Sequence, residues 1–538
     1  KKFILPFKIT FFIFFLILII LKSCSPIEEK IDYSKIFRYN ESKNITSLDP
    51  AFARNPQNIW PIQQMFNSLV QLDDSLNIKP EIAKRWEIDK SGLRYIFTLR
   101  NDVYFHSSDL FGKNRTRKVI ANDFKYSFDR LKNKNIGSPG IWVLNNVKKY
   151  EALNDSVFEI ILKKPFPAFL SLLSMRYCSV VPHEITDFYK QDFRNHPIGT
   201  GPFKFKKWKE NVKLVLRKNE NYFEKDIKNN KLPYLEAISI TFLPDVQTEF
   251  MLFKQGELDF MKSIDNSFKD DLLTPNGNLV NKYAENIKML KGPILNTEYI
   301  GFNLESKSEV VKSEKIRKAI NIGFDRNQLI SYLRNHIGFP ADRGFIPKGL
   351  SGHLIEDSIT YNPIKAKKLV DEFIKTTNLN PTITLSTDPN YIDICEFIQR
   401  ELQKIGIKVI INMMPTASLK QAKNNGKVDA FRASWIADYP DAENYLSLFY
   451  SKNFSPLGPN YTHYKNFTYD SLYEKSFGIT ELKNRISYYT KMNELIMETL
   501  PVIPIYYDQG TRFFRKNIKN IGLSPINLIH LKNVYKEN

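Results

Sequence analysis

The most regular alternation of hydrophobic and polar residues in this chain lies in its second half. Short apolar runs there predict buried strands, and the segments between them repeat their apolar residues at helical spacing. In chain order, these strands and helices are predicted at 382–386, 391–405, 407–413, 418–424 and 428–436. Strands that alternate with helices in this way predict a parallel sheet with crossover helices, and therefore an α/β fold.

Cap residues place further helices around this region. Asp245 and Gly256 bound one predicted helix, with a hydrogen-bond acceptor at its start and a glycine after its end. Ser313 and Asp325 begin two more helices in the same way, and Pro363 stands at the first position of a fourth. The sequence therefore predicts a second half that is rich in short, well-capped helices.

The first half of the chain shows a period of two, which is typical of antiparallel strands. Leu93 to Leu99 alternate apolar and polar residues, and 103–106 are expected to form the hairpin partner of that strand. Asn122 is expected to cap the helix that follows. Near the C-terminus, a helix is predicted over 481–500 and a final strand over 502–507.

Two charged residues stand at the end of the last strand of the α/β region. Arg432 lies within the apolar run, and Asp438 follows it in a turn. Burying an unpaired ion is costly, so each residue needs a partner inside the protein or faces a charged ligand. The two are not expected to pair with each other, because six residues of extended strand separate them by about 20 Å. Asp438 also lies just past the sheet edge where ligands of α/β folds bind.

The composition is that of a globular protein with a basic surface. The chain has 538 residues, 42% hydrophobic and 25% charged, and a formal net charge of +20. Removal of Lys1, Lys2, Lys8 and Lys22, which belong to an N-terminal signal described below, leaves +16. The remaining lysines are scattered, which favours a solvated basic surface over nucleic-acid binding. A basic adhesin or nucleic-acid-binding lipoprotein stays as an alternative of a different class, and its nucleic-acid binding would fall steeply with salt.

No motif assigns an enzymatic reaction. HExxH, CxxC and GxSxG are absent, no GxGxxG follows a strand, and the seven histidines are isolated from one another. His106 has no second ligand at metal-binding spacing and is interpreted as structural. The sequence therefore predicts a protein that is not an enzyme, with no metal site and no cofactor.

The N-terminus has the features of an export signal. Lysines precede an apolar run over 9–21, which is shorter than the ~20 residues of a membrane-spanning helix. The sequence LKSC that ends at Cys24 resembles a bacterial lipoprotein signal, although Lys22 stands where a small or apolar residue is commoner. Residues 1–23 are therefore predicted to be the signal peptide, Cys24 the lipidated residue, and 24–35 a tether to the membrane.

Ordered sequence blocks point to a family. They are SLDP (47–50), KPEIAKRWE (79–87), YIFTLR (95–100), FH (105–106), GTGPF (199–203), Asn219 with Tyr222, GELD (256–259), YIGFN (299–303), IRKAI (316–320) and WIADY (435–439). With these blocks, the chain from about Ile36 onward resembles the solute-binding lipoproteins of ABC importers of the oligopeptide, dipeptide and nickel type (family 5). It is most similar to the oligopeptide-binding members.

The resemblance implies the two-lobed periplasmic-binding-protein fold of type II, with an extra α+β domain inserted in the first lobe. Lobe one is expected to gather 36–67, 186–297 and 508–538. The inserted domain is expected at 68–185 and lobe two at 298–507, with hinge strands near 299–303 and 503–508. Cys178 and Cys395 then fall in different lobes and are expected to stay unpaired.

The resemblance also implies site residues. In oligopeptide-binding members, the aspartate of the WIADY block pairs with the peptide ammonium, which points to Asp438. An arginine three residues before the tryptophan lies near the peptide carboxylate, which points to Arg432. Trp435 and Tyr439 would be walls of the site. Arg54 stands where enteric relatives carry an acidic residue, so it either faces an acidic ligand or is an exposed loop residue.

The expected function is therefore capture of peptides for an ABC permease, on the periplasmic or cell-surface side of a bacterial membrane, by a lipid-anchored monomer without nucleic-acid partners. Closure of two lobes would hold an extended peptide by its termini and main chain. A metal chelate or haem is the alternative solute within the same family.

Overall fold

The computed structural model describes residues 33–355, 359–479 and 481–537. The predicted signal peptide, Cys24 and residues 24–32 of the predicted tether lie outside the described residues. Within the described ranges, no helix is both long and apolar enough to cross a membrane.

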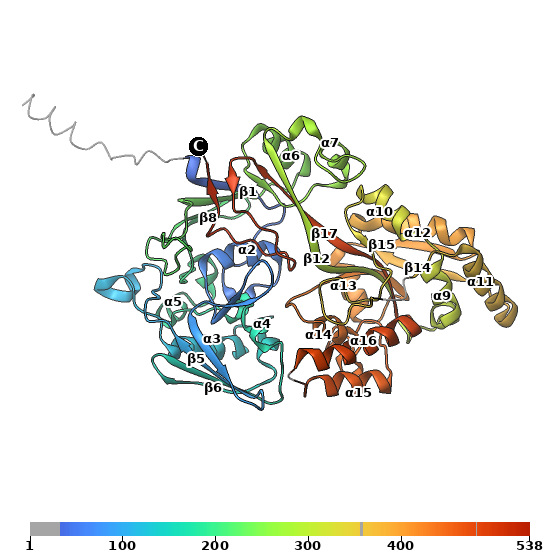
Figure 1. Ribbon diagram of the computed structural model, residues 1–538, viewed down its shortest axis with the longest axis horizontal. Coiled ribbons are helices and arrows are strands. Elements are labelled where there is room, and N and C mark those ends of the chain that lie inside the picture. Colours follow the sequence, from blue (N-terminus) through green and yellow to red (C-terminus); the bar gives the residue numbers. More distant parts are fainter. Residues whose placement is uncertain (1–32, 356–358, 480, 538) are drawn as a thin grey trace, which may run out of the picture.

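A sheet of eleven strands runs through the whole molecule and connects two lobes (Figure 1). Its two longest strands, β12 (Ile287–Phe302) and β17 (Val502–Arg515), pair antiparallel along their lengths. The pairing is irregular between Pro293 and Thr297, at the middle of β12. The predicted hinge strands are therefore parts of two strands that extend from one lobe into the other.

The second lobe confirms the predicted α/β region. Strand β14 pairs in parallel with both β15 and β16, and helices connect them as crossovers. The elements are β14 (Thr382–Thr387), α12 (Ile392–Lys404), β15 (Lys408–Met413), α13 (Thr416–Asn424) and β16 (Ala430–Ile436). Each predicted boundary lies within two residues of the observed one. β16 pairs antiparallel with β12, so the α/β unit is attached directly to the long central strands.

Helices cover both faces of this lobe. Predicted caps are confirmed at Ser313 and Asp325, whose side-chain oxygens accept hydrogen bonds from the first turns, and the helix predicted from Pro363 is capped by Asn362. The helices are α8 (Glu309–Lys312), α9 (Glu314–Ile322), α10 (Arg326–Arg334), α11 (Pro363–Thr377), α14 (Glu443–Leu446), α15 (Phe467–Ser476) and α16 (Leu482–Thr499), and the short strand β13 (Phe339–Pro340) pairs with β17.

The first lobe holds the other end of the sheet. β1 lies between β10 and β11 and runs parallel to both, and β11 pairs antiparallel with β17. Its elements are β1 (Ile36–Asn40), α2 (Pro56–Met65), β8 (Phe203–Lys209), β9 (Lys213–Lys218), β10 (Ala237–Thr241), α6 (Val246–Gln255), β11 (Phe260–Met261) and α7 (Lys269–Leu272). The C-terminal segment packs on α2, where the Trp60 indole donates a hydrogen bond of 2.8 Å to the carbonyl of Asn527.

A separate four-stranded antiparallel sheet forms beside the first lobe, as an inserted α+β unit. Its strand order is β4 (Ala83–Ile88), β5 (Arg94–Leu99), β7 (Val157–Leu162), β6 (Val147–Asn154), with helix α3 (Ala121–Lys132) against it. The remaining short elements are β2 (Val70–Leu72), β3 (Ile78–Pro80), α4 (Phe169–Leu173), α5 (His183–Tyr189), β18 (Ile518–Lys519) and β19 (Tyr535–Lys536).

Two local predictions in this region are wrong. Residues 103–106 do not form a hairpin partner of β5, because β4 and β7 already occupy both edges of that strand. Asn122 does not cap α3 either. The Asp123 carboxylate accepts from the backbone N–H of Ile120 instead, so the capping group stands one residue later than predicted.

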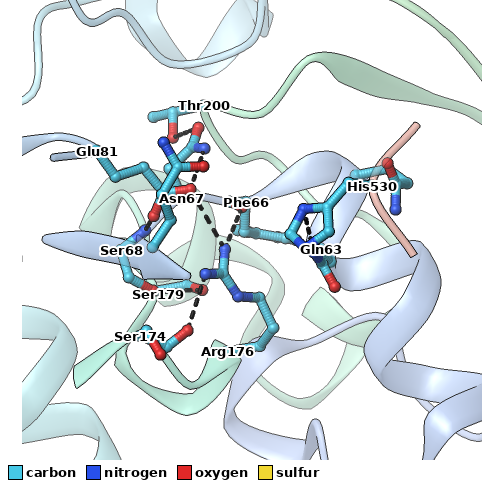
Figure 2. A network of polar contacts seen from close by, with 12 residues as sticks. Gln63, Phe66, Asn67, Ser68, Glu81, Ser174, Arg176, Ser179, Thr200 and His530 are labelled. Atoms are coloured by element: carbon cyan, nitrogen blue, oxygen red, sulfur yellow. Dashed lines mark hydrogen bonds and ion pairs between the residues drawn. The ribbon is translucent and has the colours of Figure 1, made fainter. Parts of the chain in front are cut away.

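A buried polar network joins the inserted unit to the first lobe (Figure 2). The Glu81 carboxylate accepts from the Ser68 N–H at 2.6 Å and from the Asn67 side chain at 2.8 Å. The Arg176 guanidinium lies 3.6 Å from the same carboxylate, and both side chains are less than 10% exposed. Thr200 donates to Asn67 at 2.9 Å. Burial raises the pKa of Glu81 and the Arg176 charge opposes that shift, so the arginine is needed to keep the carboxylate ionised.

The GTGP turn is part of the same joint. Gly199 and Gly201 press against α2: a β-carbon on either would lie 2.1 and 2.5 Å from the carbonyl oxygens of Met65 and Gln64. Glycine is therefore required here by close approach of the backbone, since neither residue has a positive φ. His106 is structural as predicted: its imidazole bonds the Gly201 carbonyl at 2.9 Å, and burial lowers its pKa to about 4.

The two described cysteines lie in different hydrophobic clusters. Cys178 packs in the core shared by the first lobe and the inserted unit, whereas Cys395 packs among the helices of the second lobe. Both thiols are buried and free, and burial raises the pKa of each.

Candidate functional site

The site is built around the end of β16, whose two faces differ. Arg432, Ser434 and Ile436 lie on one face because side chains alternate along a strand. Phe431 and Ala433 lie on the other face and pack into a hydrophobic cluster with α14 and α16. Ser434 and Ile436 are exposed although they stand on a central strand, so the first face is open to solvent.

That open face borders a cavity of about 440 Å³ between the lobes. The second lobe contributes side chains from β12 and β16, and the first lobe contributes Lys262, Thr511 and Arg512. This volume lies in the range of pockets that hold small ligands. Its position beside the long strands β12 and β17 means that any movement of one lobe against the other changes its shape.

Arg432 lies at this face but is neutralised within the protein. Its guanidinium forms an ion pair with Glu298 of the neighbouring strand β12, where Glu298 lies opposite Ser434. It also lies 3.7 Å from the Asp388 carboxylate and 3.0 Å from the ring centroid of Tyr391. Burial alone would lower the pKa of Arg432, but the Glu298 and Tyr391 charges outweigh burial and raise it. The arginine therefore stays charged, with its charge already compensated.

Asp438 lies just beyond β16, as expected, and is not compensated. Its side chain is exposed, yet the surrounding protein raises its pKa by desolvation, which a hydrogen bond with Asn444 only partly offsets. Of the WIADY block, Ile436 lines the cavity of about 440 Å³, and Asp438 stands two residues further along the chain. Among the described residues, no cation forms an ion pair with this carboxylate. The structure thus separates Arg432 and Asp438, in agreement with the sequence-based expectation.

A second set of contacts fixes the loop that carries Asp438. The Asn444 side-chain oxygen accepts from the Trp435 indole at 2.9 Å and from the Asp438 N–H at 3.2 Å. Tyr439 is buried, donates its hydroxyl to Glu443, and packs its ring edge-on against Phe166 of the inserted unit at 6.2 Å. The two predicted wall residues therefore position Asp438, and Tyr439 also joins the two lobes.

Arg54 belongs to the first lobe and lies just before α2. Arg54 is exposed. Burial and the Asp438 charge raise the pKa of Tyr177, and the Arg54 charge lowers it. In the second lobe, burial raises the pKa of Tyr461 and lowers that of Lys420, and the Arg54 charge lowers both. Sequence reasoning missed these three residues and Lys423. No signal in the sequence indicated them, since they belong to no sequence block and lie on separate elements, with Lys420 and Lys423 on α13.

The described residues hold no group of three or more histidine, cysteine or acidic side chains arranged to bind a metal ion. The WIADY block lies at the recess, whereas blocks such as KPEIAKRWE and GTGPF lie in the joint of Figure 2. Glu81 and Thr200 of these two blocks thus help to stabilise the scaffold, whereas the WIADY block carries Asp438.

Comparison with known proteins identifies the family. The model of the bacterial extracellular solute-binding proteins, family 5 (middle), matches residues 77–456. The chain is 25% identical over 533 residues to the dipeptide-binding protein DppE of Bacillus subtilis (strain 168), covering 94% of this chain and 92% of the relative. It is 27% identical over 531 residues to heme-binding protein A of Haemophilus influenzae, covering 94% and 93%.

The fold also matches solved structures over almost the whole chain. The ABC transporter-associated periplasmic binding protein DppA from Helicobacter pylori, in complex with the peptide STSA, superimposes with a TM-score of 0.79 at 25% identity, covering 94% of this chain and 98% of that one. The expected type II periplasmic-binding-protein fold is thereby confirmed. The chain therefore belongs to family 5 of the bacterial extracellular solute-binding proteins, a transport family whose members bind solutes outside the cytoplasm.

Proposed function

We propose that this protein captures peptides and delivers them to an ABC permease. The observation that carries the proposal is the Asp438 carboxylate, which is desolvated, accessible and without a cationic partner among the described residues. A peptide ammonium supplies the missing positive charge, and a charge-assisted hydrogen bond of this kind is among the stronger polar contacts. Relatives whose names state dipeptide or peptide binding support the same assignment.

The two lobes provide a structural means to retain a bound peptide. The candidate site lies between them, and β12 and β17 are the long strands that connect them. Closure over an extended peptide would exclude water and strengthen the contact with Asp438. Arg432 remains a candidate for the carboxylate end, although it must share its charge with Glu298. This arrangement fits a protein that binds a solute rather than one that catalyses a reaction.

Mass spectrometry of small molecules released by denaturing the purified mature protein tests the ligand class. We expect peptides with free N-termini, and fewer of them from an Asp438→Asn variant purified in parallel. Recovery of one uniform non-peptide compound, such as a metal chelate or haem, without peptides would contradict the proposal. The relative named for haem binding makes this outcome a meaningful alternative.

We also propose that the mature protein is anchored to the membrane by acyl chains on Cys24, with the following residues as a tether. Two acyl signals or more give stable membrane attachment, whereas loss of the acylated cysteine removes it. Cys24→Ala should therefore appear as a soluble or unprocessed protein when cell fractions are compared by immunoblotting. Membrane attachment identical to that of the wild type would rule out lipidation at this residue.

A further inference from the structure

Two cations of the first lobe lie side by side in the wall of the interlobe cavity. Arg512 of β17 and Lys262, which follows β11, both line this cavity of about 440 Å³. The Arg512 guanidinium donates a hydrogen bond of 2.7 Å to the Lys262 carbonyl. Both charged groups also lie near the Trp60 ring of α2, at 5.4 Å and 5.8 Å from its centroid. These contacts hold the two positive charges next to each other.

The two cations share a single carboxylate. Lys262 forms an ion pair of 2.7 Å with Glu41, whose side chain is buried. Arg512 is 4% exposed, and among the described residues no carboxylate lies within ion-pairing distance of it. It donates instead to neutral acceptors, the Thr511 carbonyl at 3.2 Å and the side-chain oxygen of Asn527. Neutral acceptors and aromatic rings hold a cation without neutralising it, so this wall carries an excess positive charge.

The other cations that line the cavity have partners of their own. Arg334 forms an ion pair of 2.8 Å with Asp508, which lines the same cavity. Lys269 lies 3.1 Å from the carboxylate of Asp270. The excess charge therefore belongs to Arg512 and Lys262 and is not a general property of the cavity.

The wall that the second lobe contributes has the opposite balance. Arg432 forms an ion pair with Glu298 and lies 3.7 Å from Asp388, so one cation faces two carboxylates. Glu298 itself lines the cavity. A ligand carboxylate would be repelled by that wall and attracted by the wall that carries Arg512. The charge distribution thus favours an anion at the first-lobe end of the cavity.

Burial makes the excess charge at Arg512 costly. Burial lowers the pKa of Arg512 to about 10, although the Glu41 charge opposes that shift, so the side chain is still cationic at neutral pH. A buried ion without a countercharge destabilises a protein, and an anion that pairs with it offsets part of that cost. The neighbouring Lys262 side chain is 35% exposed, so an anion in the cavity can reach this pair of cations.

We infer that Arg512 and Lys262 bind the terminal carboxylate of the peptide, in place of Arg432. This inference rests on the proposed function, because it specifies which residues hold the second end of the same ligand. A peptide without charged side chains carries one ammonium and one carboxylate. Asp438 matches the ammonium from the second lobe, and the excess charge at Arg512 matches the carboxylate from the first lobe. The lobes must therefore close for one peptide to engage both residues.

Isothermal titration calorimetry with alanine peptides of two to five residues tests the inference. Each length is used with a free terminal carboxylate and as the C-terminal amide, and all peptides keep a free amino terminus. We expect the wild-type protein to bind the free acid about 30-fold more tightly than the amide. Lys262→Gln and Arg512→Gln should each reduce this ratio to about fivefold or less, while the amides bind as before.

Two further variants complete the design. Arg512→Lys keeps the positive charge and loses the planar guanidinium, so it should retain more of the ratio than Arg512→Gln. Lys204→Gln is the matched control for Lys262→Gln. Lys204 lies on β8, is 36% exposed and forms an ion pair of 2.6 Å with Glu220, outside the cavity. This control should leave the ratio unchanged.

The outcomes separate this inference from the proposed function. Equal binding of acids and amides to the wild type would overturn the inference and leave peptide capture intact. A wild-type ratio in Lys262→Gln would overturn it as well, and this partly exposed position decides the result even where Arg512→Gln fails to fold. Binding of neither series to the wild type would overturn both.

Discussion

Replacing Asp438 with asparagine is expected to weaken binding of peptides with a free amino terminus by about 3 kcal/mol, on the order of 100-fold in Kd. Asparagine keeps the size of the side chain and its contact with Asn444, but it removes the charge that faces the peptide ammonium. Calorimetry with Ala-Glu-Ala and N-acetylated Ala-Glu-Ala measures the effect.

The acetylated peptide serves as the control for this prediction. It lacks the ammonium, so it should bind wild type and Asp438→Asn with similar, weak affinity, and the double-mutant cycle isolates the contact. The wild-type affinity should also fall on acidification, because protonation removes the charge of Asp438. Since the pKa of this residue is raised, the fall begins at a higher pH than for an ordinary aspartate. If acetylation of the peptide weakened binding equally in wild type and in Asp438→Asn, Asp438 would not be the residue that binds the peptide ammonium.

Replacing Arg176 with methionine is expected to destabilise the protein by about 3 to 5 kcal/mol, the usual cost of leaving a buried carboxylate without its countercharge. Glu81 would keep its bonds to Ser68 and Asn67 but lose the buried arginine beside it, and the carbonyls of Phe66 and Ser174 would lose their donor. Urea unfolding followed by circular dichroism measures the change in the free energy of unfolding.

An exposed ion pair provides the matched control. Arg115 lies 3.0 Å from Asp109 with both side chains mostly exposed, so Arg115→Met should leave the unfolding curve unchanged. Adding Glu81→Gln to Arg176→Met should recover part of the lost stability, because the unpaired charge is then absent. A loss no larger than that of the control would show that the joint of Figure 2 does not depend on its charge pair.

Much of the fold could be predicted because the signals are local. Caps such as Ser313 and Asp325 and the alternation around β14, β15 and β16 depend on neighbouring residues only, and they place elements within two residues. The predictions failed where the local structure depends on residues that are far apart in the sequence. Residues 103–106 cannot pair with β5 because β7 takes that edge, and Gly199 is required by a carbonyl of α2 far away in sequence.

The candidate site also has parts that could be predicted from the sequence and parts that could not. Asp438 could be located from the end of a buried strand and a sequence block, and the structure leaves its charge unpaired. The compensation of Arg432 could not be predicted, because Glu298 lies 134 residues earlier in the chain.

The position of β17 near the end of the chain has a consequence for biosynthesis. β11 acquires its antiparallel partner only when Phe513 and Phe514 are available, and the Trp60 indole of α2 acquires its acceptor only when Asn527 is available. A chain that is synthesised and exported from its N-terminus therefore cannot complete its first lobe until almost all of it has left the ribosome. The sheet order itself therefore delays completion of the first lobe.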